Sequence, residues 1–501
     1  MLSILERAKR LVFKAKFCRH IKIFQKILTQ NTGALSVPKP VRSIPVRHYN
    51  MKTPIYDFVM AYANSDKRRL HMPGHKGNGS LGFEKYDITE ISGADALFVA
   101  DGIIAESEKN LTEIYETRAS LYSCEGSSLA VRAMLYLAML HAKEAREGKD
   151  DCRDFVLAGR NAHSSFMTAL ALLDLDVKWL YPSREQSYLS CQITPEYLEK
   201  CLDVCEKKPI CVYITSPDYL GRLSDISALS SVCKRHGVLL VVDNAHGAYL
   251  KFLENDAHPI SQGADMCCDS AHKTLECLTG GAYLHISKTA PRSLVKNAKG
   301  AMSVFASTSP SYLILSSLDK LNEYLATEVR SDLRDTLLHL SEIRSRLKQA
   351  GYTLCEQEEL KITVKATDYG YFGYEIGKIL EENDIIPELA DTEYVVLMAG
   401  IRARKSDLDA LCEVLLNIPK REKKATPVLD FDIPKPLLTP RQALLSPRER
   451  VSVRDAVGRI FVGFTLPCPP AVAIVVAGEQ ITGEIAEALA YYGHKTVEVA
   501  L

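Results

Sequence analysis

The stretch VLLVVDNAHG, residues 238–247, joins an apolar run to a polar turn. Its five leading aliphatic residues predict a strand buried on both faces, which is typical of a parallel sheet lying between two layers of helices. The polar residues that follow begin at Asp243. In open sheets of this kind ligands bind beyond the carboxyl ends of the strands, so the turn after residue 242 is a candidate site.

Similar apolar runs alternate with helical segments on either side of this stretch. They predict strands at residues 155–158, 177–181, 210–215, 238–243, 266–269 and 282–286. Thr194 and Pro195 supply an N-cap and a first-position proline for one intervening helix, and Asp225 can begin another. The pattern predicts an α/β fold whose large domain is built on a mostly parallel, doubly wound sheet.

Beyond this region the pattern changes. Apolar residues at helical spacing predict one long connecting helix over residues 316–351. Residues 360–366 and 394–399 indicate strands of a smaller α+β unit, and a proline-rich linker at 427–440 precedes a final segment. We therefore expect a basic N-terminal extension at 1–50, a large domain at 51–318, a small α+β domain with its connecting helix at 319–425, and a C-terminal segment at 426–501.

Composition argues against several classes of protein. The 501 residues are 47% apolar and 25% charged, as in ordinary globular proteins, and 62 basic side chains balance 62 acidic ones. Without net charge there is no global field to attract nucleic acid or a membrane surface, so we expect a small-molecule partner. Pro467, Pro469 and Pro470 interrupt the apolar stretch at 460–478, which argues against a membrane span. The 14 cysteines form no C-x-x-C pair and are expected to be reduced.

Asp243 and Lys273 are the first candidates for chemistry. Asp243 ends a buried strand and, taken alone, could equally be a helix cap or a turn residue. Lys273 follows the next apolar run, within DSAHKT at 269–274. A lysine directly after a buried strand is costly unless it is paired or neutralised, whereas a Schiff-base lysine is held there with a lowered pKa. An isolated lysine in a loop would usually be solvated, so the signal lies in the combination.

A phosphate-binding cluster is expected near these two residues. Gly126, Ser127 and Ser128 precede a helical run, and such a helix start offers backbone N–H groups and the positive end of the helix dipole to phosphate. Ser270 and His272 can donate hydrogen bonds to the same group. The same residue types also make an ordinary helix cap, so this cluster alone is a weak signal.

Three histidines are candidates for other roles. His163 follows a predicted strand and could either stack on a planar ring or cap the next helix. His71 and His75 have the spacing of a metal-binding pair, but Pro73 and Gly74 between them prevent the helix that this geometry needs. No metal site is therefore predicted.

Several motifs together resemble the Orn/Lys/Arg decarboxylase family of fold type I enzymes, which use pyridoxal 5′-phosphate (PLP). The stretches DNAHGA at 243–248 and SAHKTL at 270–275 look like the cofactor site of that family. Further motifs occur in the family's order: HMPGHK at 71–76, DITE at 87–90, RNAH at 160–163, SPDY at 216–219, and TSPSY at 308–312 with SLD at 317–319. The similarity runs from about residue 51 to the last segment.

The resemblance implies a role for each candidate residue. Lys273 would hold PLP as a Schiff base, Asp243 would keep the ring nitrogen protonated, and His163 would stack on the ring. Lys273 and His246 are the candidates for returning a proton to the substrate. The phosphate and the rest of the cofactor would be held by Gly126, Ser127, Ser128, Ser270, His272, Ala245 and Ser309.

The implied reaction is decarboxylation of arginine, lysine or ornithine for polyamine supply in the cytoplasm. The TSPSY segment is similar to one that reaches a neighbouring subunit's site, which implies a homodimer or a larger homo-oligomer. Two alternatives stay open. In an aminotransferase or another PLP lyase of the same fold, Arg402 or Arg404 would bind the carboxylate. The other is a catalytically silent homologue, against which the retention of Lys273 and Asp243 argues.

The chain departs from the family pattern at several positions. Asn244 stands where an acid is usual, Asp218 where a threonine is common, and Glu125 where an asparagine is usual. Residues 467–473 and 477–479 resemble the family's Tyr-Pro-Pro-Gly-Ile-Pro and Pro-Gly-Glu motifs without their tyrosine, glycine and prolines. These changes leave the expected cofactor contacts in place and bear mainly on the identity of the substrate.

The first 50 residues contain eleven Lys or Arg against the single acid Glu6. This composition resembles an organelle transit peptide, but a disordered tail or an upstream start before Met51 is the favoured interpretation. We predict that a chain starting at Met51 keeps its fold and activity, because the motifs begin only at His71 and the tail composition suits no packed core. Melting temperature and activity of the two chains test this, and a large loss of either would show that the tail is structural.

Overall fold

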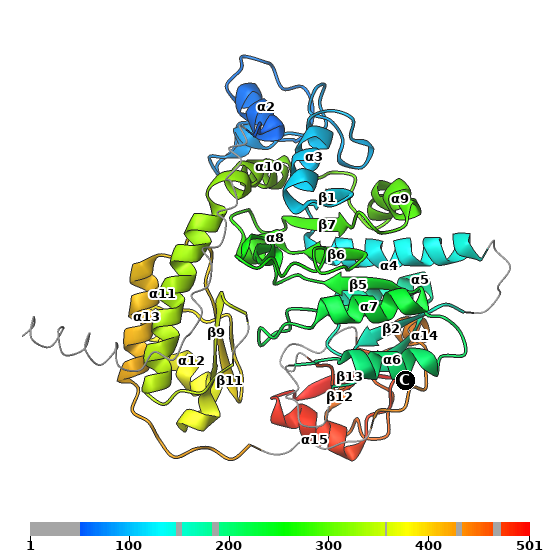
Figure 1. Cartoon of the computed structure of the whole chain (residues 1–501), viewed down its shortest axis with the longest axis vertical. Coiled ribbons are helices and arrows are strands. Elements are labelled where there is room, and N and C mark those ends of the chain that lie inside the picture. The colour runs from blue at the N-terminus through cyan, green and yellow to red at the C-terminus, as the bar shows by residue number, and fades with distance from the viewer. Residues whose placement is uncertain (1–50, 147–152, 183–189, 356–357, 427–432, 464–471) are drawn as a thin grey trace, which may run out of the picture. The chain divides into compact units, whose positions relative to one another are not determined.

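The structure is a computed structural model that describes residues 51–146, 153–182, 190–355, 358–426, 433–463 and 472–501 (Figure 1). The expected N-terminal extension and the three prolines at 467–470 lie outside these ranges. The described residues belong to one compact unit. Every helix in these ranges is too short or too polar to cross a membrane.

A seven-stranded sheet forms the centre of the large domain. Its strand order is β1-β7-β6-β5-β4-β2-β3, in which β2 to β6 run parallel and β7 runs antiparallel to both of its neighbours. The predicted, mostly parallel sheet is thus confirmed. The strands are β1 (Ala119–Ser123), β2 (Phe155–Gly159), β3 (Asp176–Leu180), β4 (Cys211–Thr215), β5 (Leu239–Asp243), β6 (Met266–Asp269) and β7 (Ala282–Ile286).

Strand β1 is the one that the sequence pattern missed. Its residues ASLYS interrupt the apolar side chains with two serines, and both serines are buried. Ser120 is satisfied inside the protein, since its hydroxyl lies 2.7 Å from His285 Nδ1 and 2.6 Å from Thr117 Oγ1. A strand whose polar groups pair with other buried side chains carries no continuous apolar run for sequence analysis to detect.

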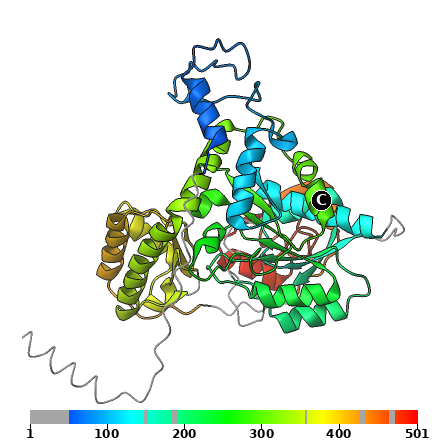
Figure 2. The ribbon, with the colours of Figure 1, turned by 45° about the horizontal axis from the view of Figure 1, so that its top comes forward.

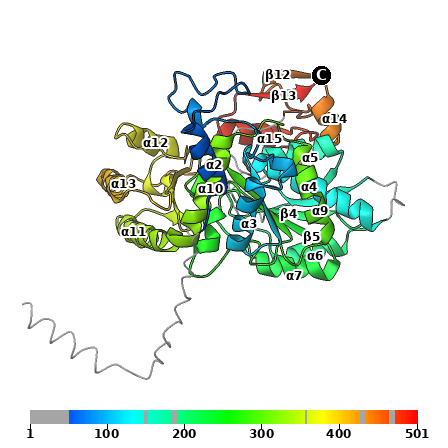
Figure 3. The ribbon, with the colours of Figure 1, turned by 90° about the horizontal axis from the view of Figure 1, so that it is seen from above.

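Helices cover both faces of this sheet (Figure 3). Helices α4 (Gly126–Ala145), α5 (Ser164–Leu173) and α9 (Arg292–Ser303) pack on one face with Val241 and Met266. Helices α6 (Pro195–Asp203) and α7 (Ile226–His236) cover the other face with Leu240 and Val242. Strand β5 is therefore buried on both sides, as its aliphatic run predicted.

The long connecting helix predicted at 316–351 is wrong in one respect, because it is two helices. They are α10 (Tyr312–Thr327) and α11 (Val329–Gln349), with a break at Glu328. Glu328 at the break and Asp332 in the first turn of α11 both form ion pairs with Arg402. The apolar period continues across Glu328, which is why the sequence pattern could not reveal the break.

The N-terminal elements pack against α10. They are α2 (Pro54–Ala63), the 3₁₀ turns η1 (Glu84–Tyr86) and η2 (Leu97–Val99), and α3 (Ile103–Tyr115). Asp319 of α10 fixes this contact, since its carboxylate accepts hydrogen bonds from the backbone N–H groups of Ile55 and Tyr56 at 2.8 and 2.9 Å. These are two of the donors that the first turn of α2 leaves without a helical partner.

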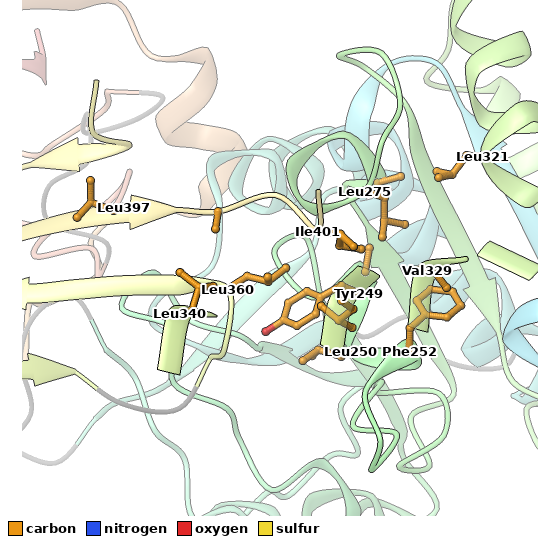
Figure 4. Close-up of a cluster of buried hydrophobic side chains, with 14 of the residues drawn as sticks. Tyr249, Leu250, Phe252, Leu275, Leu321, Val329, Leu340, Leu360, Leu397 and Ile401 are labelled. Atoms are coloured by element: carbon orange, nitrogen blue, oxygen red, sulfur yellow. The ribbon is translucent and has the colours of Figure 1, made fainter. Parts of the chain in front are cut away.

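A second, antiparallel sheet has the order β10-β11-β9-β8. Its strands are β8 (Leu354–Cys355), β9 (Lys361–Lys365), β10 (Leu389–Ala390) and β11 (Tyr394–Met398), with η4 (Ala366–Tyr369), α12 (Gly373–Glu381) and α13 (Lys405–Asn417) beside α11. Figure 4 shows the apolar cluster that joins the two sheets, from Leu397 through Leu360 and Tyr249 to Leu275. Burying one such aliphatic side chain contributes about 1.5–3 kcal/mol.

The C-terminal elements form a small layer of their own, drawn orange to red in Figures 1 and 2. A two-stranded antiparallel sheet, β12–β13, packs with a helix around a core that includes Phe461, Ile485 and Leu489. The preceding helix, α14, packs on α5 of the large domain. The elements are α14 (Pro440–Leu445), β12 (Arg448–Ser452), α15 (Gly483–Tyr491) and β13 (Thr496–Ala500).

Candidate active site

The predicted site residues follow the carboxyl ends of neighbouring strands. His163 lies after β2, Asp243 ends β5, and Lys273 lies in α8 (Ala271–Thr274) directly after β6. Because these strands run parallel, their carboxyl ends meet at one edge of the sheet. The charges of Asp243 and Lys273 both act on His163, and that of Asp243 acts on Lys273. The structure therefore brings these three residues together.

Lys273 lies beside His246. Its Nζ is 3.1 Å from His246 Nε2, and the amine donates because the unprotonated ring nitrogen accepts. Desolvation lowers the pKa of Lys273 and the charge of Lys361 adds to this effect, while Asp243 and Glu388 oppose it. Burial also lowers the pKa of His246 well below its ordinary value, with contributions from Lys361 and Lys273. An amine with a lowered pKa is suited to forming a covalent bond with a carbonyl group.

Asp243 is held rigidly by its neighbours. Its Oδ2 accepts a hydrogen bond from Tyr213 Oη at 2.9 Å, and its Oδ1 accepts one from the backbone N–H of Ala245 at 3.2 Å. The carboxylate is almost fully buried. Asp243 therefore makes the turn contact considered from the sequence, but it does not cap a helix, since the next helical turn, η3 (Ala248–Phe252), begins only five residues later. Tyr213, on the neighbouring strand β4, escaped prediction because it lies inside an apolar run.

The residues expected to hold phosphate meet at the start of α4. Ser270 Oγ donates to Ser127 Oγ at 2.7 Å, which joins the loop after β6 to the first turn of this helix. Gly126 begins α4 with a φ of +69°, a conformation that favours glycine. Its N–H donates to Gly280 O at 2.8 Å, while His272 Nδ1 lies 2.9 Å from Gly281 O. Gly280 and Gly281 therefore join the start of α4 to the loop after β6, which are the two segments expected to bind phosphate.

Ser128 and Ser309 are less closely engaged. Ser128 lies in the first turn of α4, beside Ser127. Ser309 is exposed, and its backbone N–H donates to Ser307 Oγ at 3.1 Å. The backbone N–H of Ser307 in turn donates to Glu125 Oε1 at 2.7 Å, so the loop that carries Ser309 is anchored next to the start of α4. Glu125 stands where the resemblance has an asparagine, whose side-chain oxygen could accept the same bond.

His163 caps a helix, as one of its two predicted roles required. Its Nδ1 accepts a hydrogen bond from the backbone N–H of Ser165 at 3.2 Å at the start of α5. Burial lowers the pKa of His163, with Lys273 and Arg132 adding to the effect and Asp243 opposing it. A neutral ring held by its Nδ1 atom has a fixed orientation, and this leaves its faces available for stacking.

Three further residues lie near the site: Tyr219 belongs to the SPDY motif, whereas sequence analysis did not single out Lys361 and Glu388. Tyr219 lies against His246, with ring centroids 5.8 Å apart, and its hydroxyl is 3.5 Å from Glu388 Oε1. Lys361 of β9 is buried, and its Nζ lies 3.5 Å from Glu358 Oε2 and from Asp218 O. Glu388 and Lys361 belong to the second sheet or its connections, so only the tertiary fold brings them to the carboxyl end of the first.

Arg402 is engaged elsewhere. Its guanidinium binds the carboxylates of Glu276, Glu328 and Asp332 and stacks over the ring of Tyr324 at 4.2 Å. Arg404 is exposed and pairs with Asp407. Both guanidinium groups are thus paired with acidic side chains, whereas an aminotransferase needs a guanidinium that is available to bind the substrate carboxylate.

A buried ion pair joins the C-terminal elements to the loop that carries His163. Arg160 Nη1 and Nη2 donate to the two carboxylate oxygens of Glu479 at 2.7 and 2.6 Å, and both side chains are almost fully buried. Arg160 Nε also donates to Ala473 O at 2.8 Å. Arg160 lies three residues before His163, so its ion pair with Glu479 fixes the position of the loop that carries His163. The RNAH and AGE motifs, far apart in sequence, are thus partners in space.

We predict that Glu479→Ala lowers the free energy of unfolding by about 3–5 kcal/mol, because it leaves the Arg160 guanidinium buried without a counter-ion. Urea unfolding of the full chain measures the change. The matched control is Glu498→Ala in the same C-terminal layer, where the pairs with Arg448 and Arg450 are partly exposed and are worth about 1 kcal/mol or less. Equal decreases in the free energy of unfolding of the two variants would contradict a special stabilising role of the Arg160–Glu479 ion pair.

Comparison with known proteins identifies the family. Residues 53–366 match the family described as "Orn/Lys/Arg decarboxylase, major domain", and residues 428–496 match its "C-terminal domain". The chain belongs to the Orn/Lys/Arg decarboxylase family. It is accordingly an amino-acid decarboxylase of the PLP-dependent type, and the resemblance read from the sequence motifs is confirmed.

Curated relatives of this decarboxylase align over most of their length. An uncharacterized protein named YaaO from Bacillus subtilis (strain 168) is 27% identical over 470 residues, which cover 88% of this chain and 94% of the relative. An arginine decarboxylase of Halalkalibacterium halodurans is 26% identical and covers 86% and 91%. An arginine decarboxylase of B. subtilis is 27% identical and covers 86% and 92%.

Solved structures share the fold. The lysine decarboxylase LdcF of Francisella novicida superposes with a TM-score of 0.73 at 16% identity, covering 90% of this chain and 82% of the other. The constitutive lysine decarboxylase of E. coli gives a TM-score of 0.71 at 17% identity, with the same coverage. These matches confirm the predicted fold type I architecture of the decarboxylase, with its large, mostly parallel sheet and smaller C-terminal part.

Two departures from the family pattern are explained by local contacts in this decarboxylase. Asn244 is fully buried, and its Nδ2 donates to Asp269 Oδ1 at 2.7 Å, so the amide complements a neighbouring acid. Asp218 is also buried, and its carboxylate accepts hydrogen bonds from Ser190 Oγ at 2.5 Å and from the backbone N–H of Arg222 at 2.8 Å. The Asp218 carboxylate is thus held by two donors, whereas the buried Oδ1 of Asn244 has no hydrogen-bond partner within the described ranges.

The residues present fit a PLP cofactor. His246 Nδ1 is buried and has no hydrogen-bond partner within the described ranges, so it is free to meet a ligand. The Ser127–Ser270 hydroxyl pair and the N-terminus of α4 offer donors to a phosphate. The amine of Lys273 and the buried carboxylate of Asp243 have the chemistry that the cofactor carbonyl and ring nitrogen require.

Proposed function

We propose that this decarboxylase acts on a basic amino acid, with PLP held on Lys273, and that arginine is its preferred substrate. The observation that carries the proposal is the amine of Lys273 lying 3.1 Å from His246 Nε2, with Asp243 fixed on the adjoining strand. The preference for arginine is supported by relatives named arginine decarboxylase that align along most of this chain. Lysine and ornithine are the alternative substrates.

The cofactor-holding roles follow from the positions of the side chains. Bound PLP would supply an electron sink for the electron pair of the broken bond between Cα and the carboxylate. Lys273 Nζ would attach the cofactor, Asp243 would hold a proton on the ring nitrogen, and His163 would lie against the ring. The remaining contacts would come from Gly126, Ser127, Ser128, Ala245, Ser270, His272 and Ser309.

Lys273 and His246 are the groups that would return a proton to Cα. In the free site Lys273 Nζ donates to His246 Nε2, which leaves the proton of the neutral histidine on Nδ1. Burial lowers the pKa of both groups, so His246 is held neutral and Lys273 gives up its proton more readily than a solvated lysine. His246 therefore acts either as the donor itself or as the partner that orients the lysine.

The basic end of the substrate would meet Glu388. This exposed carboxylate lies within 3.5 Å of the Tyr219 hydroxyl, and its charge reaches Lys273. Carboxylates pair strongly with guanidinium and ammonium groups. Asp218 is a poorer candidate, because the hydroxyl of Ser190 and a backbone N–H already occupy its oxygens.

We propose that the active unit is a homodimer. Large apolar side chains are exposed in the loop at 70–83, namely Leu70, Met72, Leu81 and Phe83, and Val304 is exposed just before the TSPSY segment. Apolar surface of this kind is typical of an interface with another protein surface. A second copy of this chain would cover it.

We also propose that the enzyme supplies polyamine precursors in the cytoplasm. Loss of carbon dioxide converts arginine into agmatine and converts lysine or ornithine into a diamine. The described cysteines, 11 in number, are all free thiols, which suits a reducing compartment.

Release of carbon dioxide from a panel of amino acids tests the function directly. The purified full chain with added PLP is expected to act on arginine in preference to lysine and ornithine, and to leave neutral and acidic amino acids unchanged. Transfer of the amino group to a keto acid without carbon dioxide release would instead indicate an aminotransferase. A chain that binds no PLP and releases no carbon dioxide would be the silent homologue.

The buried cation Lys361 gives a prediction about pH. Because its charge lowers the pKa of both Lys273 and His246, Lys361→Met should raise both values. Lys273 would then keep its proton to a higher pH, so the midpoint for attachment of PLP to the apoenzyme should move upward. Lys365→Met on the same strand is the control and should leave the midpoint unchanged. A midpoint that is the same in wild type and Lys361→Met would contradict this assignment.

A further inference from the structure

Arg132 is a single charged residue in an apolar part of helix α4. Between Gly126 and Ala142 it is the one side chain of the Lys, Arg, Asp and Glu types. Its neighbours Val131 and Ala133 are fully buried, and Arg132 itself is partly buried. A cation in such a position is costly unless an anion compensates its charge. The position of Arg132 therefore indicates that it binds an anion.

The guanidinium of Arg132 has no anionic partner within the described parts of the chain. Its Nε atom is buried and makes no hydrogen bond there, and no carboxylate pairs with the group. Glu125 lies seven residues earlier, on the same face of the helix. It is engaged elsewhere, because its Oε1 accepts a hydrogen bond from the backbone N–H of Ser307 at 2.7 Å. The anion that would satisfy Arg132 is thus not one of these side chains.

The geometry of α4 directs Arg132 toward the start of the helix. Ser128 and Arg132 are four residues apart and so share one face. Side chains of an α-helix tilt toward its N-terminus, and a long side chain covers the turn before its own Cα atom. The guanidinium is therefore expected over the first turn of α4, where Ser127 Oγ accepts a hydrogen bond from Ser270 Oγ at 2.7 Å.

A second observation relates Arg132 to the candidate active site. Helices α4 and α5 pack against each other, and His163 is the N-cap of α5. Burial lowers the pKa of His163, Asp243 opposes this shift, and the charges of Lys273 and Arg132 add to it. Arg132 therefore acts on the same histidine as the two residues expected to bind the cofactor ring and its carbonyl.

A phosphate at the start of α4 would need a counter-charge. A phosphate monoester carries about 1.5 to 2 negative charges at pH 7. The donors expected there are serine hydroxyls, the ring of His272 and backbone N–H groups, none of which is a permanent cation. The N-terminus of a helix is equivalent to roughly half a positive charge. Most of the phosphate charge would remain uncompensated without a cation.

We propose that Arg132 binds the phosphate of PLP and supplies this counter-charge. The inference rests on the proposed use of PLP, and it adds a cofactor contact that neither the sequence motifs nor the family resemblance assigns. Guanidinium groups bind phosphate oxygens through two parallel N–H donors, and such charge-assisted hydrogen bonds are stronger than those of neutral donors. Arg132 is therefore a cofactor-binding residue that raises the affinity for PLP.

Titration of the apoenzyme with PLP and with pyridoxal, which lacks the phosphate, tests the proposal. The absorbance of the bound cofactor measures binding without substrate or turnover. For Arg132→Met we expect the dissociation constant of PLP to rise about 10- to 100-fold, since a charge-assisted contact to the phosphate is lost. The dissociation constant of pyridoxal should stay unchanged. Inorganic phosphate should compete with PLP for the wild-type chain and compete more weakly for the variant.

Two further variants separate the charge of Arg132 from its packing. Arg132→Lys keeps the charge and should lose less affinity for PLP than Arg132→Met. Lys143→Met removes an exposed cation from the last turn of the same helix, and this matched control should bind PLP as the wild type does. Melting temperatures of the apo forms show which variants are folded, and Arg132→Lys allows the same comparison of PLP with pyridoxal if Arg132→Met does not fold.

Several results would overturn the proposal. Equal weakening of PLP and pyridoxal binding would show that Arg132 supports the structure of the site or a subunit contact. An unchanged dissociation constant of PLP would also overturn it, and weaker substrate binding in that variant would assign Arg132 to the substrate carboxylate. Both results leave the proposed decarboxylase function standing. A wild-type chain that binds neither PLP nor pyridoxal would instead refute that function together with this contact.

Discussion

Replacing Lys273 with alanine is expected to abolish both carbon dioxide release and covalent attachment of PLP. The fold should survive, because the side chain lies outside the apolar core and the backbone N–H of residue 273 keeps its bond to Ser270 O at 3.0 Å. The variant should therefore melt near the wild-type temperature while losing the absorption band of lysine-bound cofactor. Visible absorbance, activity and melting temperature measure the three effects.

Borohydride reduction followed by peptide mapping identifies the attached lysine. The label is expected on the peptide that contains Lys273. Lys288→Ala, at an exposed lysine that follows β7, is the control and should retain the label and the activity. Attachment of the label to any other lysine of the wild-type chain would refute the assignment.

Asp243→Asn is expected to lower kcat by several orders of magnitude. If the carboxylate pairs with the protonated ring nitrogen of PLP, the asparagine amide has no charge to hold that proton. The lost interaction would strengthen as negative charge enters the ring in the transition state, so the loss should fall on kcat more than on substrate binding. Kinetic constants and PLP affinity of the variant and the wild type measure it.

The same variant should fold, which separates a role in the reaction from a role in stability. The oxygen of the introduced amide can accept from the backbone N–H of Ala245, and its NH₂ group can donate to Tyr213 Oη, so both present contacts have a replacement. Tyr213→Phe is the matched control, since it removes one hydrogen bond but keeps the charge, and it should reduce kcat far less. Near-wild-type turnover of Asp243→Asn with bound PLP would contradict the proposed role.

The large sheet could be predicted because its strands carry their own signal. The run at 238–243 is apolar on both faces, and the two helix starts at Thr194 and Asp225 are capped as their residue types predicted. β1 was missed because it carries two buried serines, of which Ser120 is paired by the distant side chain of His285. The break at Glu328 was missed because the helical period runs through it unchanged. In both cases tertiary contacts determined the local structure.

The site residues that directly follow strands of the large sheet could be predicted from the sequence. Those that come from other parts of the chain could not. Asp243 ends β5 and Lys273 follows the adjacent parallel strand β6, so their proximity could be inferred before any coordinates. Lys361 and Glu388 come from the second sheet, and the buried pair of Arg160 and Glu479 spans 319 positions of the chain. Periodicity and local motifs describe neighbours in sequence, and they say nothing about such pairs.

The contact of α2 with α10 has a consequence for synthesis of the chain. The carboxylate that binds the N–H groups of Ile55 and Tyr56 belongs to Asp319, and β1 pairs with β7 through residues as far apart as 119 and 286. At about 5–20 residues per second, the ribosome needs roughly 8–50 s to make the intervening stretches of about 170 to 260 residues. During that time α2 and α3 lack their partner α10, and β1 lacks its partner β7. The nascent chain is then a substrate for holding chaperones until the segment around Asp319 emerges.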